Sequence, residues 1–300
     1  MSKLCNICPR KCNIMRGVFT PEKILPGVCH TPELPMVARA GLHHWEEPVI
    51  SGERGSGTVF FSGCNLNCVY CQNYNISSEI EGKVITVERL KNIYQELIDL
   101  GAHNINLVTP THYSEAILDS LAEPLSVPVV YNTNSYDSVE TLKRFENKVQ
   151  IYLADYKYAD NTLGRQYSGV KDYAEVAFAA IKEMYRQTGN YVIDDNGIMQ
   201  KGIIIRHLIL PGAVENTLKV IKLVAENFRP GEVLFSLMRQ YLPCGKVSAT
   251  EYPELNRRVS DEEYEIIEEA LFDSGIEDGF VQDESSASGD FIPCFDGSGV

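Results

Sequence analysis

Long apolar runs are absent from this sequence. The longest, Gly202–Leu210, is interrupted by Arg206 and His207, whereas a membrane-spanning helix needs about 20 predominantly apolar residues. The first six residues also lack the apolar stretch of a secretory signal peptide. We therefore expect a cytoplasmic protein that has no membrane partner.

Basic residues are scarce, and none follows Arg258. The chain has 27 Lys and Arg against 41 Asp and Glu, a formal net charge of −14; 13 of the acids lie after Arg258, so 28 acids accompany the 27 basic residues before it. Phosphate binding needs a basic surface, so we expect no nucleic-acid partner. The acidic run is explained by a helix from Ser260 to Ser274 with a solvated face; steering of a basic partner is the alternative.

Nine cysteines are present, and in a cytosolic chain they are better explained as metal ligands than as disulfides. Cys64, Cys68 and Cys71 follow an apolar run, Thr58–Phe61, that reads as a buried strand ending in a turn. Three thiolates this close can hold three irons of a [4Fe–4S] cube, which normally takes four cysteines. The fourth iron would then be open, as at a catalytic metal. A three-cysteine zinc site or reduced core thiols are the alternatives.

The spacing Cys-x3-Cys-x2-Cys, with Tyr70 before the last cysteine, resembles the radical S-adenosylmethionine (radical SAM) superfamily. The continuation Cys71–Tyr74 and the cysteine-rich segment ahead of it resemble the PflX-like branch, related to pyruvate formate-lyase activating enzymes. The resemblance covers nearly the whole chain. It implies S-adenosylmethionine on the open iron, a partial (β/α)6 barrel of the TIM type, and a flavodoxin- or ferredoxin-type electron donor.

The hydrophobic pattern itself predicts an α/β fold. Short apolar segments alternate with helical patterns, which indicates a parallel sheet wrapped by helices, with chemistry at the C-terminal strand ends. We expect a cysteine-rich segment over residues 1–50 and a partial barrel with an acidic C-terminal helix and tail over 51–300. A surface hairpin is expected at 192–199. The predicted strands are 57–62, 103–109, 127–133, 149–155, 202–210 and 232–238, and the predicted helices are 86–100, 113–122, 137–146, 172–188, 213–228 and 260–274.

A second metal site is predicted near the N-terminus. Cys5, Cys8, Cys12 and Cys29 offer four thiolates within 25 residues, enough to close a zinc site or a second iron–sulfur cluster. The segment is loop-rich and would have little to hold it together without metal. A closed set of four thiolates has no open position, so its role would be structural or electron relay.

Polar residues at the next two strand ends are candidate ligands. Thr109, Thr111 and His112 stand where activating enzymes usually carry a Gly-Gly-Glu motif for the amino group of S-adenosylmethionine, and the acid is missing. His112 is a catalytic candidate by position, and a structural histidine is the alternative. Asn132 and Thr133 stand where the family places ribose contacts, although Asn also favours turns.

Three further strand ends complete the predicted site. Asp155 and Lys157, the Asp-x-Lys of activating enzymes, share one side of a strand and are catalytic candidates. Arg206 and His207 are cofactor-binding candidates because charge inside an apolar strand is costly unless paired. Met238 lies where relatives contact adenine, and a core role explains it equally well.

Together these features predict an oxidoreductase that cleaves S-adenosylmethionine to a 5′-deoxyadenosyl radical, which abstracts hydrogen from a substrate. The subfamily resemblance implies a protein substrate, a glycyl-radical enzyme. A small-molecule radical reaction is the main alternative. A non-catalytic iron–sulfur electron carrier and a protein with structural zinc are the others, although a carrier has no need of polar residues at so many strand ends.

Overall fold

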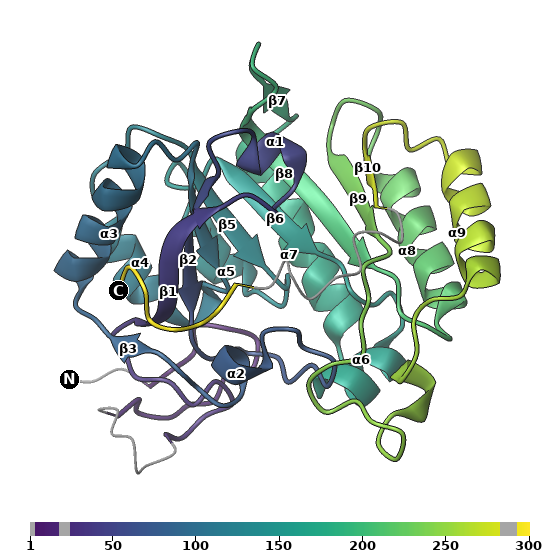
Figure 1. Cartoon of the computed structure of the whole chain (residues 1–300), viewed down its shortest axis with the longest axis horizontal. Coiled ribbons are helices and arrows are strands. Elements are labelled where there is room, and N and C mark those ends of the chain that lie inside the picture. Colours follow the sequence, from purple (N-terminus) through teal and green to yellow (C-terminus); the bar gives the residue numbers. More distant parts are fainter. Residues whose placement is uncertain (1–3, 18–24, 283–292) are drawn as a thin grey trace.

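The computed structural model describes residues 4–17, 25–282 and 293–300. Within them a largely parallel sheet forms the centre of the molecule (Figure 1). Every strand predicted from the sequence is present, and one further parallel strand pairs with the last of them. The parallel strands are β2 (Ser56–Phe61), β4 (Ile105–Val108), β5 (Val129–Thr133), β6 (Ile151–Asp155), β8 (Met199–Leu208), β9 (Leu234–Met238) and β10 (Gly279–Val281), in that spatial order.

Antiparallel strands extend one side of the sheet. β1 (Met36–His43) pairs with β2, and β3 (Lys83–Val84) pairs with the start of β1. Farther along the same side of β1, Gly297 N–H donates to Ala38 O at 3.0 Å and Ala40 N–H donates to Ser298 O at 3.0 Å. The sheet therefore crosses the predicted boundary at position 50, because β1 lies in the segment 1–50 and β2 lies in the segment 51–300. In the described ranges β10 and β3 are its two ends, so the sheet is a partial barrel rather than a closed one.

The predicted hairpin is confirmed as β7 (Val192–Ile193), which pairs antiparallel with β8. All six predicted helices are also confirmed, and most cover the outer face of the sheet (Figure 1). They are α3 (Val87–Asp99), α4 (Ser114–Ser120), α5 (Val139–Lys143), α7 (Tyr173–Thr188), α8 (Val214–Asn227) and α9 (Asp261–Asp273). Shorter helices not predicted are α1 (Pro48–Ser51), α2 (Tyr74–Ser77) and α6 (Asn161–Ser168), and 3-10 turns at Thr111–Tyr113 and Pro253–Leu255.

Local sequence signals explain where the helices begin. The Thr86 side chain accepts a hydrogen bond from the Arg89 N–H and caps α3, whose buried residues recur at helical spacing. At α9, Ser260 and Glu263 form a capping box, as expected of that acidic run. The acidic residues after Gln282, up to position 292, lie outside the described residues.

The concave face of the sheet has an apolar layer and a polar layer. Helix α1 places Val49 and Ile50 against apolar side chains of β5, β6, β8 and β9, including Leu153 and Ile204. Because side chains alternate along a strand, the residue two positions later returns to the same face. Those later residues are Asn132, Asp155, Arg206 and Ser236. The fold therefore gathers polar groups from four strands above an apolar floor, toward the C-terminal edge.

Candidate active site

The three-cysteine loop begins directly after β2. Gly63 has φ +83°, and a Cβ there would lie 2.7 Å from the Cys29 carbonyl oxygen and 2.2 Å from Thr31 Cγ2. A glycine is needed both for the backbone conformation and for this close approach. The loop is therefore packed directly against the N-terminal cysteine segment.

Each of the three thiols has a polar partner. Ser168 Oγ lies 3.0 Å from Cys68 Sγ, and Ser77 Oγ donates to Cys71 Sγ at 3.3 Å. Asn134 Nδ2 donates to Cys64 Sγ at 3.4 Å. Such hydrogen bonds favour a thiolate and tune the potential of an iron–sulfur cluster.

The chemistry of these donors fits a cube-shaped cluster better than a single ion. Cys64, Cys68 and Cys71 lie close enough to perturb one another electrostatically. Across residues 4–17, 25–282 and 293–300, however, no three His, Cys, Asp or Glu side chains are arranged to hold one metal ion. A cube attaches each thiolate to a different iron, which suits thiols that are neighbours without converging on one point.

A buried charge network lies beside the loop. Lys157 Nζ donates to Asp155 Oδ2 at 2.7 Å, and Arg206 Nε donates to Asp155 Oδ1 at 2.9 Å. Burial alone would raise the pKa of Asp155, but Arg206 and Lys157 hold it below its ordinary value. Burial raises the pKa of the Cys68 thiol to about 11, and the Lys157 ammonium opposes that rise. Lys157 thus connects the predicted strand-end pair to the cysteine loop.

Glu46, which the sequence analysis did not single out, completes this network. Its carboxylate accepts hydrogen bonds from Arg206 Nη1 at 3.1 Å and from Asn132 Nδ2 at 3.2 Å. Arg206 Nη2 in turn donates to Asn132 Oδ1 at 2.7 Å. Glu46 reaches the network from the connection between β1 and α1. The only local signal for it is the pair of acids before Pro48, where a short helix begins.

Its neighbour Glu47 is almost fully buried, with 5% of its surface exposed. The Ser236 hydroxyl donates to Glu47 Oε1 at 2.9 Å, whereas Oε2 has no hydrogen-bond partner among the described residues. Burial raises the pKa of Glu47, although Arg206 opposes the shift. The interior of the half-barrel therefore has three acidic side chains, Glu46, Glu47 and Asp155, against two basic ones, Lys157 and Arg206.

The end of β4 has an unusual backbone. Thr109 has φ +58°, which is rare for a β-branched residue, and its N–H donates to Asn132 O at 2.8 Å. His112, on the following turn, is buried; its Nε2 lies 2.8 Å from Ser62 O. Burial lowers the pKa of His112 to about 3, so its ring is neutral near pH 7. Thr111 is fully buried beside it.

Two predicted ligands lie on the other face of the sheet. His207 Nδ1 lies 2.7 Å from Tyr156 O and its Nε2 lies 2.9 Å from Thr217 Oγ1, so both ring nitrogens are occupied within the core. The Thr133 hydroxyl donates to the Asp137 carboxylate at 2.5 Å. Their neighbours Arg206 and Asn132 take the interior positions, because adjacent strand residues face opposite sides. The expected cofactor contacts of His207 and Thr133 are corrected to core contacts.

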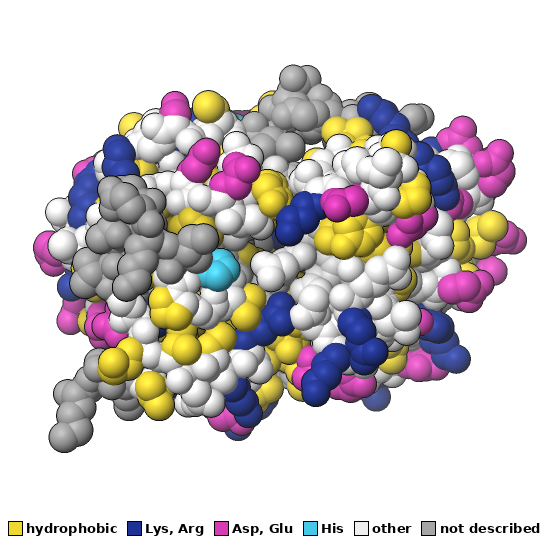
Figure 2. Space-filling view, turned by 90° about the horizontal axis from the view of Figure 1, so that it is seen from below, with side chains coloured by type: hydrophobic (Ala, Val, Ile, Leu, Met, Phe, Trp, Pro, Cys, Tyr) yellow, Lys and Arg dark blue, Asp and Glu magenta, His cyan; other side chains and the backbone are white. Residues whose placement is uncertain are grey.

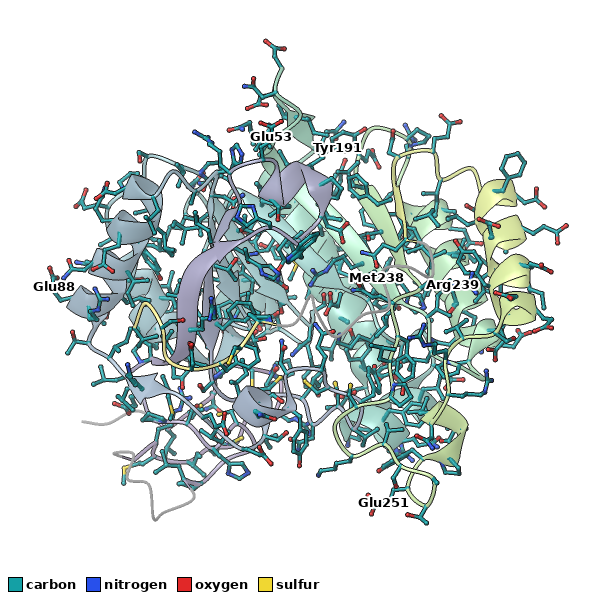
Figure 3. All side chains as sticks on the ribbon, in the orientation of Figure 1. Glu53, Glu88, Tyr191, Met238, Arg239 and Glu251 are labelled. Carbon is teal, nitrogen blue, oxygen red and sulfur yellow. The ribbon has the colours of Figure 1, made fainter. Side chains whose placement is uncertain are left out.

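Tyr70 and Met238 are buried close to the site. The Tyr70 hydroxyl lies 2.5 Å from the Tyr158 hydroxyl, which lies 2.8 Å from Ser168 Oγ and so connects Tyr70 to Cys68. Met238, labelled in Figure 3, ends β9 on the same face as Ser236. Its backbone oxygen accepts from the Ile209 N–H at 3.0 Å, and its sulfur accepts from Gln240 Nε2 at 3.6 Å.

The four N-terminal cysteines lie in one compact segment. The Cys5 N–H donates to Ile14 O at 2.8 Å, and the charges of Cys5, Cys12 and Cys29 each raise the pKa of Cys8, although burial is the largest cause. Sulfur atoms are visible in the lower middle of Figure 3, next to this segment. The structure therefore places the four cysteines near one another, although, like the three loop cysteines, they do not converge on a single metal position among the described residues.

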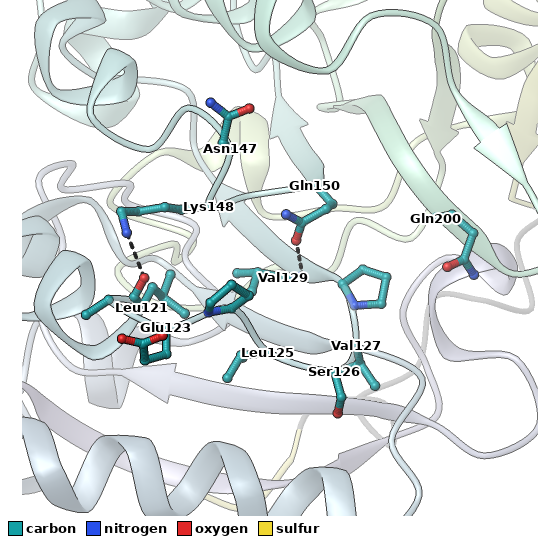
Figure 4. Close-up of a pocket in the computed structure, with 13 residues that line it drawn as sticks. Leu121, Glu123, Leu125, Ser126, Val127, Val129, Asn147, Lys148, Gln150 and Gln200 are labelled. Atoms are coloured by element: carbon teal, nitrogen blue, oxygen red, sulfur yellow. Dashed lines mark hydrogen bonds between the residues drawn. The ribbon is translucent and has the colours of Figure 1, made fainter.

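One pocket lies at the wrong edge of the sheet for this chemistry. It has a volume of about 320 Å³ and is lined mainly by residues 121–129, with Lys148 and Gln150 (Figure 4). Val129 and Gln150 stand at the N-terminal ends of their strands, opposite the cysteine loop. Lys148 Nζ is already bonded to Leu121 O at 2.7 Å, so we assign this pocket no part in the site.

The α/β half-barrel and the three-cysteine loop agree with the family comparison. A model described as the radical SAM superfamily matches residues 58–194. The chain belongs to this superfamily of enzymes. Among curated proteins, the uncharacterised protein MJ0674 of Methanocaldococcus jannaschii is 32% identical over 279 residues, which cover 90% of this chain and 73% of that protein.

Solved structures resemble the chain only distantly. SuiB of Streptococcus suis bound to S-adenosylmethionine matches with a TM-score of 0.49 and 15% identity, over 74% of this chain and 48% of SuiB. HydG of Carboxydothermus hydrogenoformans matches with a TM-score of 0.47 and 15% identity, over 79% of this chain and 55% of HydG. A domain of pyruvate-formate lyase-activating enzyme from Bacteroides vulgatus matches with a TM-score of 0.40 and 14% identity, over 57% of this chain and 92% of that domain. The chain thus spans about half of SuiB and HydG. No described helix is long and apolar enough to cross a membrane.

Proposed function

We propose that the chain cleaves S-adenosylmethionine at a [4Fe–4S] cluster held by Cys64, Cys68 and Cys71, and that the product radical takes hydrogen from a protein substrate. The observation that carries this proposal is the position of Lys157, whose ammonium donates to the Asp155 carboxylate at 2.7 Å and lies near enough to Cys68 to lower the pKa of its thiol against the effect of burial. The three-cysteine loop therefore lies next to the charged residues at the C-terminal ends of β6 and β8. A cluster bound here would supply the electron that breaks the carbon–sulfur bond.

The protein's own residues would bind and orient the cofactor. Asp155 and Glu46 are carboxylates suited to an ammonium group, and Lys157 and Arg206 are cations suited to a carboxylate. The amide of Asn132 suits ribose hydroxyls. Glu46 also supplies an acid that the end of β4 lacks. The apolar floor around Leu153 would keep water from reaching the site from below, which would protect a reactive intermediate held above it.

The N-terminal cysteines would hold a second metal group. Cys8 is buried and its three partners are half-buried, so a bound metal would be shielded from solvent. The set approaches the catalytic loop at the contact between Cys29 and Gly63. A second cluster at this place could pass electrons to the first, whereas zinc would only stabilise the segment.

The loop assignment is tested by reconstituting the protein with iron and sulfide under anaerobic conditions. Cys68→Ala should lose the cluster and all 5′-deoxyadenosine formation with S-adenosylmethionine and dithionite. Cys294→Ala, which removes an exposed thiol, is the matched control and should keep both. Turnover retained by Cys68→Ala would overturn the assignment, and zinc in place of iron would favour a structural site.

The substrate class is tested separately. The Asp-x-Lys pair supports a glycyl-radical enzyme as substrate, through the resemblance to activating enzymes. Incubation with a candidate acceptor protein labelled with deuterated glycine should give a glycyl radical in the electron paramagnetic resonance spectrum and deuterium in 5′-deoxyadenosine. Deuterium transfer from a small molecule instead would replace the protein substrate while leaving the cleavage chemistry intact.

A further inference from the structure

A basic pocket lies on the outer side of the cysteine loop. It has a volume of about 390 Å³ and lies where α6 ends. Its lining residues are Pro9, Arg10, Tyr136, Arg165, Gly169, Val170, Lys171 and Asp172. Three of these are cations and one is an acid, in a chain whose net charge is −14.

Arg10 attaches this pocket to the metal loop. Its Nε donates to Asn65 O at 2.8 Å, and its Nη1 and Nη2 donate to Gly169 O at 2.7 Å and Ser168 O at 3.3 Å. Asn65 follows Cys64 directly, and the Ser168 hydroxyl touches the sulfur of Cys68. Arg10 is thus separated from the proposed cluster ligands Cys64 and Cys68 by a single residue in each case, Asn65 and Ser168.

The cations at the rim are available to a partner. Arg165 and Lys171 are exposed, and neither forms an ion pair with any residue that the structure describes. Elsewhere the arginines are mostly paired, as in Arg144 with Glu115 at 2.5 Å. Asp172, the acid of the pocket, already accepts the Tyr136 hydroxyl at 2.7 Å. Figure 2, which views the molecule from below Figure 1, shows dark blue basic side chains among magenta acidic ones on this face.

We propose that this pocket is the docking site for an acidic electron-transfer protein of the flavodoxin or ferredoxin class. This inference rests on the proposed function, which requires one electron to enter the cluster for each cleavage. Complementary charge speeds the encounter of transient redox partners, whose interfaces are small and depend on salt. The site lets such a partner approach Cys64 and Cys68 from the outer side of the cysteine loop.

The test compares charge reversals at equal net charge. Arg165→Glu with Lys171→Glu removes the rim cations, and Lys91→Glu with Lys222→Glu on α3 and α8 is the matched control. Binding of a purified acidic flavodoxin to each protein before cluster reconstitution is measured by titration at low and high salt. We expect affinity about tenfold weaker or more, with a flatter salt dependence, for the pocket variant alone.

Two measurements of turnover complete the test. After reconstitution, the pocket variant should form 5′-deoxyadenosine at the wild-type rate with dithionite and much more slowly with reduced flavodoxin. Equal flavodoxin binding by the two double variants would overturn the docking site, as would saturation of the pocket by inorganic phosphate without any flavodoxin binding. Absence of 5′-deoxyadenosine with dithionite in the wild type would instead overturn the proposed function.

Discussion

Arg206 is the residue that joins the most groups in the half-barrel. It contacts Asp155, Glu46 and Asn132, which come from β6, from the connection before α1, and from β5. Its pKa is raised above the ordinary value because these carboxylates outweigh the effect of burial. A buried ion network of this kind contributes little to stability by itself, but leaving one member unpaired is costly. The proposed binding of S-adenosylmethionine would explain why four strands present polar groups here.

Replacing Arg206 with Met should weaken S-adenosylmethionine binding about 10- to 150-fold, the equivalent of about 1.5–3 kcal/mol for one charged hydrogen bond. Arg89, a half-buried residue that pairs with Glu96 on α3, far from the polar strand ends, provides the control Arg89→Met. Calorimetric titration into the folded, reconstituted proteins measures the difference. Unchanged affinity together with a lower free energy of unfolding would show that the network is only structural.

His207 should make stability depend on pH. Burial lowers its pKa to about 4, below the ordinary 6.5, so the unfolded chain binds more protons than the folded chain between these values. The free energy of unfolding therefore rises with pH across this window, and at pH 5 about 2 kcal/mol of stability is lost relative to pH 8.

His207→Asn should reduce that pH dependence. The variant should be less stable at every pH, because hydrogen bonds to Tyr156 and Thr217 are disturbed, but its free energy of unfolding should change by about 2 kcal/mol less between pH 8 and pH 5. Urea unfolding at several pH values measures both quantities. An identical pH dependence in the two proteins would mean that His207 is not buried in its neutral form.

At the scale of elements, the sequence predicted the regular strands and helices because their signals are local. Apolar runs, capping residues and helical spacing lie within each segment, as in α3 with Thr86. β1 and α6 were not predicted, and both gain order from packing: β1 pairs with β2, and the end of α6 accepts hydrogen bonds from the cysteine loop.

Part of the site was predictable and part was not. The cysteine spacing carries its own chemistry, whereas Glu46 and Ser168 act through residues that are far away in the chain. The sequence alone could have shown that Asn132 and Thr133, or Arg206 and His207, do not both face the interior, since strand alternation allows only one of two adjacent residues to do so. Which one does so depends on register, and the pairing of Asp155 with Arg206 settles it.

The N-terminal segment is held to the rest of the molecule by few contacts. Thr141 donates to Ile7 O at 2.6 Å, Arg10 donates to Asn65 O, and Arg16 donates to His112 O. We expect chelation of a metal bound by Cys5, Cys8, Cys12 and Cys29 to make amide exchange in residues 4–17 roughly tenfold faster or more, since the metal replaces a missing core. Hydrogen–deuterium exchange measures this, with α3 as the internal control. Equal exchange with and without metal would exclude a structural role for these cysteines.

For the whole molecule, the exposed edge of the sheet matters as much as its interior. Residues 297–299 lie along β1 and satisfy the backbone groups of Ala38 and Ala40, next to the short pairing with β3 (Figure 1). Gly299 fits there because a Cβ would lie 2.2 Å from Ala40 O. We therefore expect this strip to protect the molecule against self-association, because an uncovered edge strand can pair with the same edge of another copy.

Deleting residues 294–300 should expose the backbone hydrogen-bonding groups of Ala38 and Ala40 in β1, so that this edge can pair with another copy. The shortened protein should form larger species as its concentration rises, measured by light scattering during gel filtration. Asp296→Ala, which removes the ion pair with Arg39 but keeps the backbone strip, should elute as the full chain does. If the shortened protein also elutes unchanged at every concentration, the strip has no protective role. If it associates, an affinity tag joined to this strip would risk aggregation by pulling it away from β1.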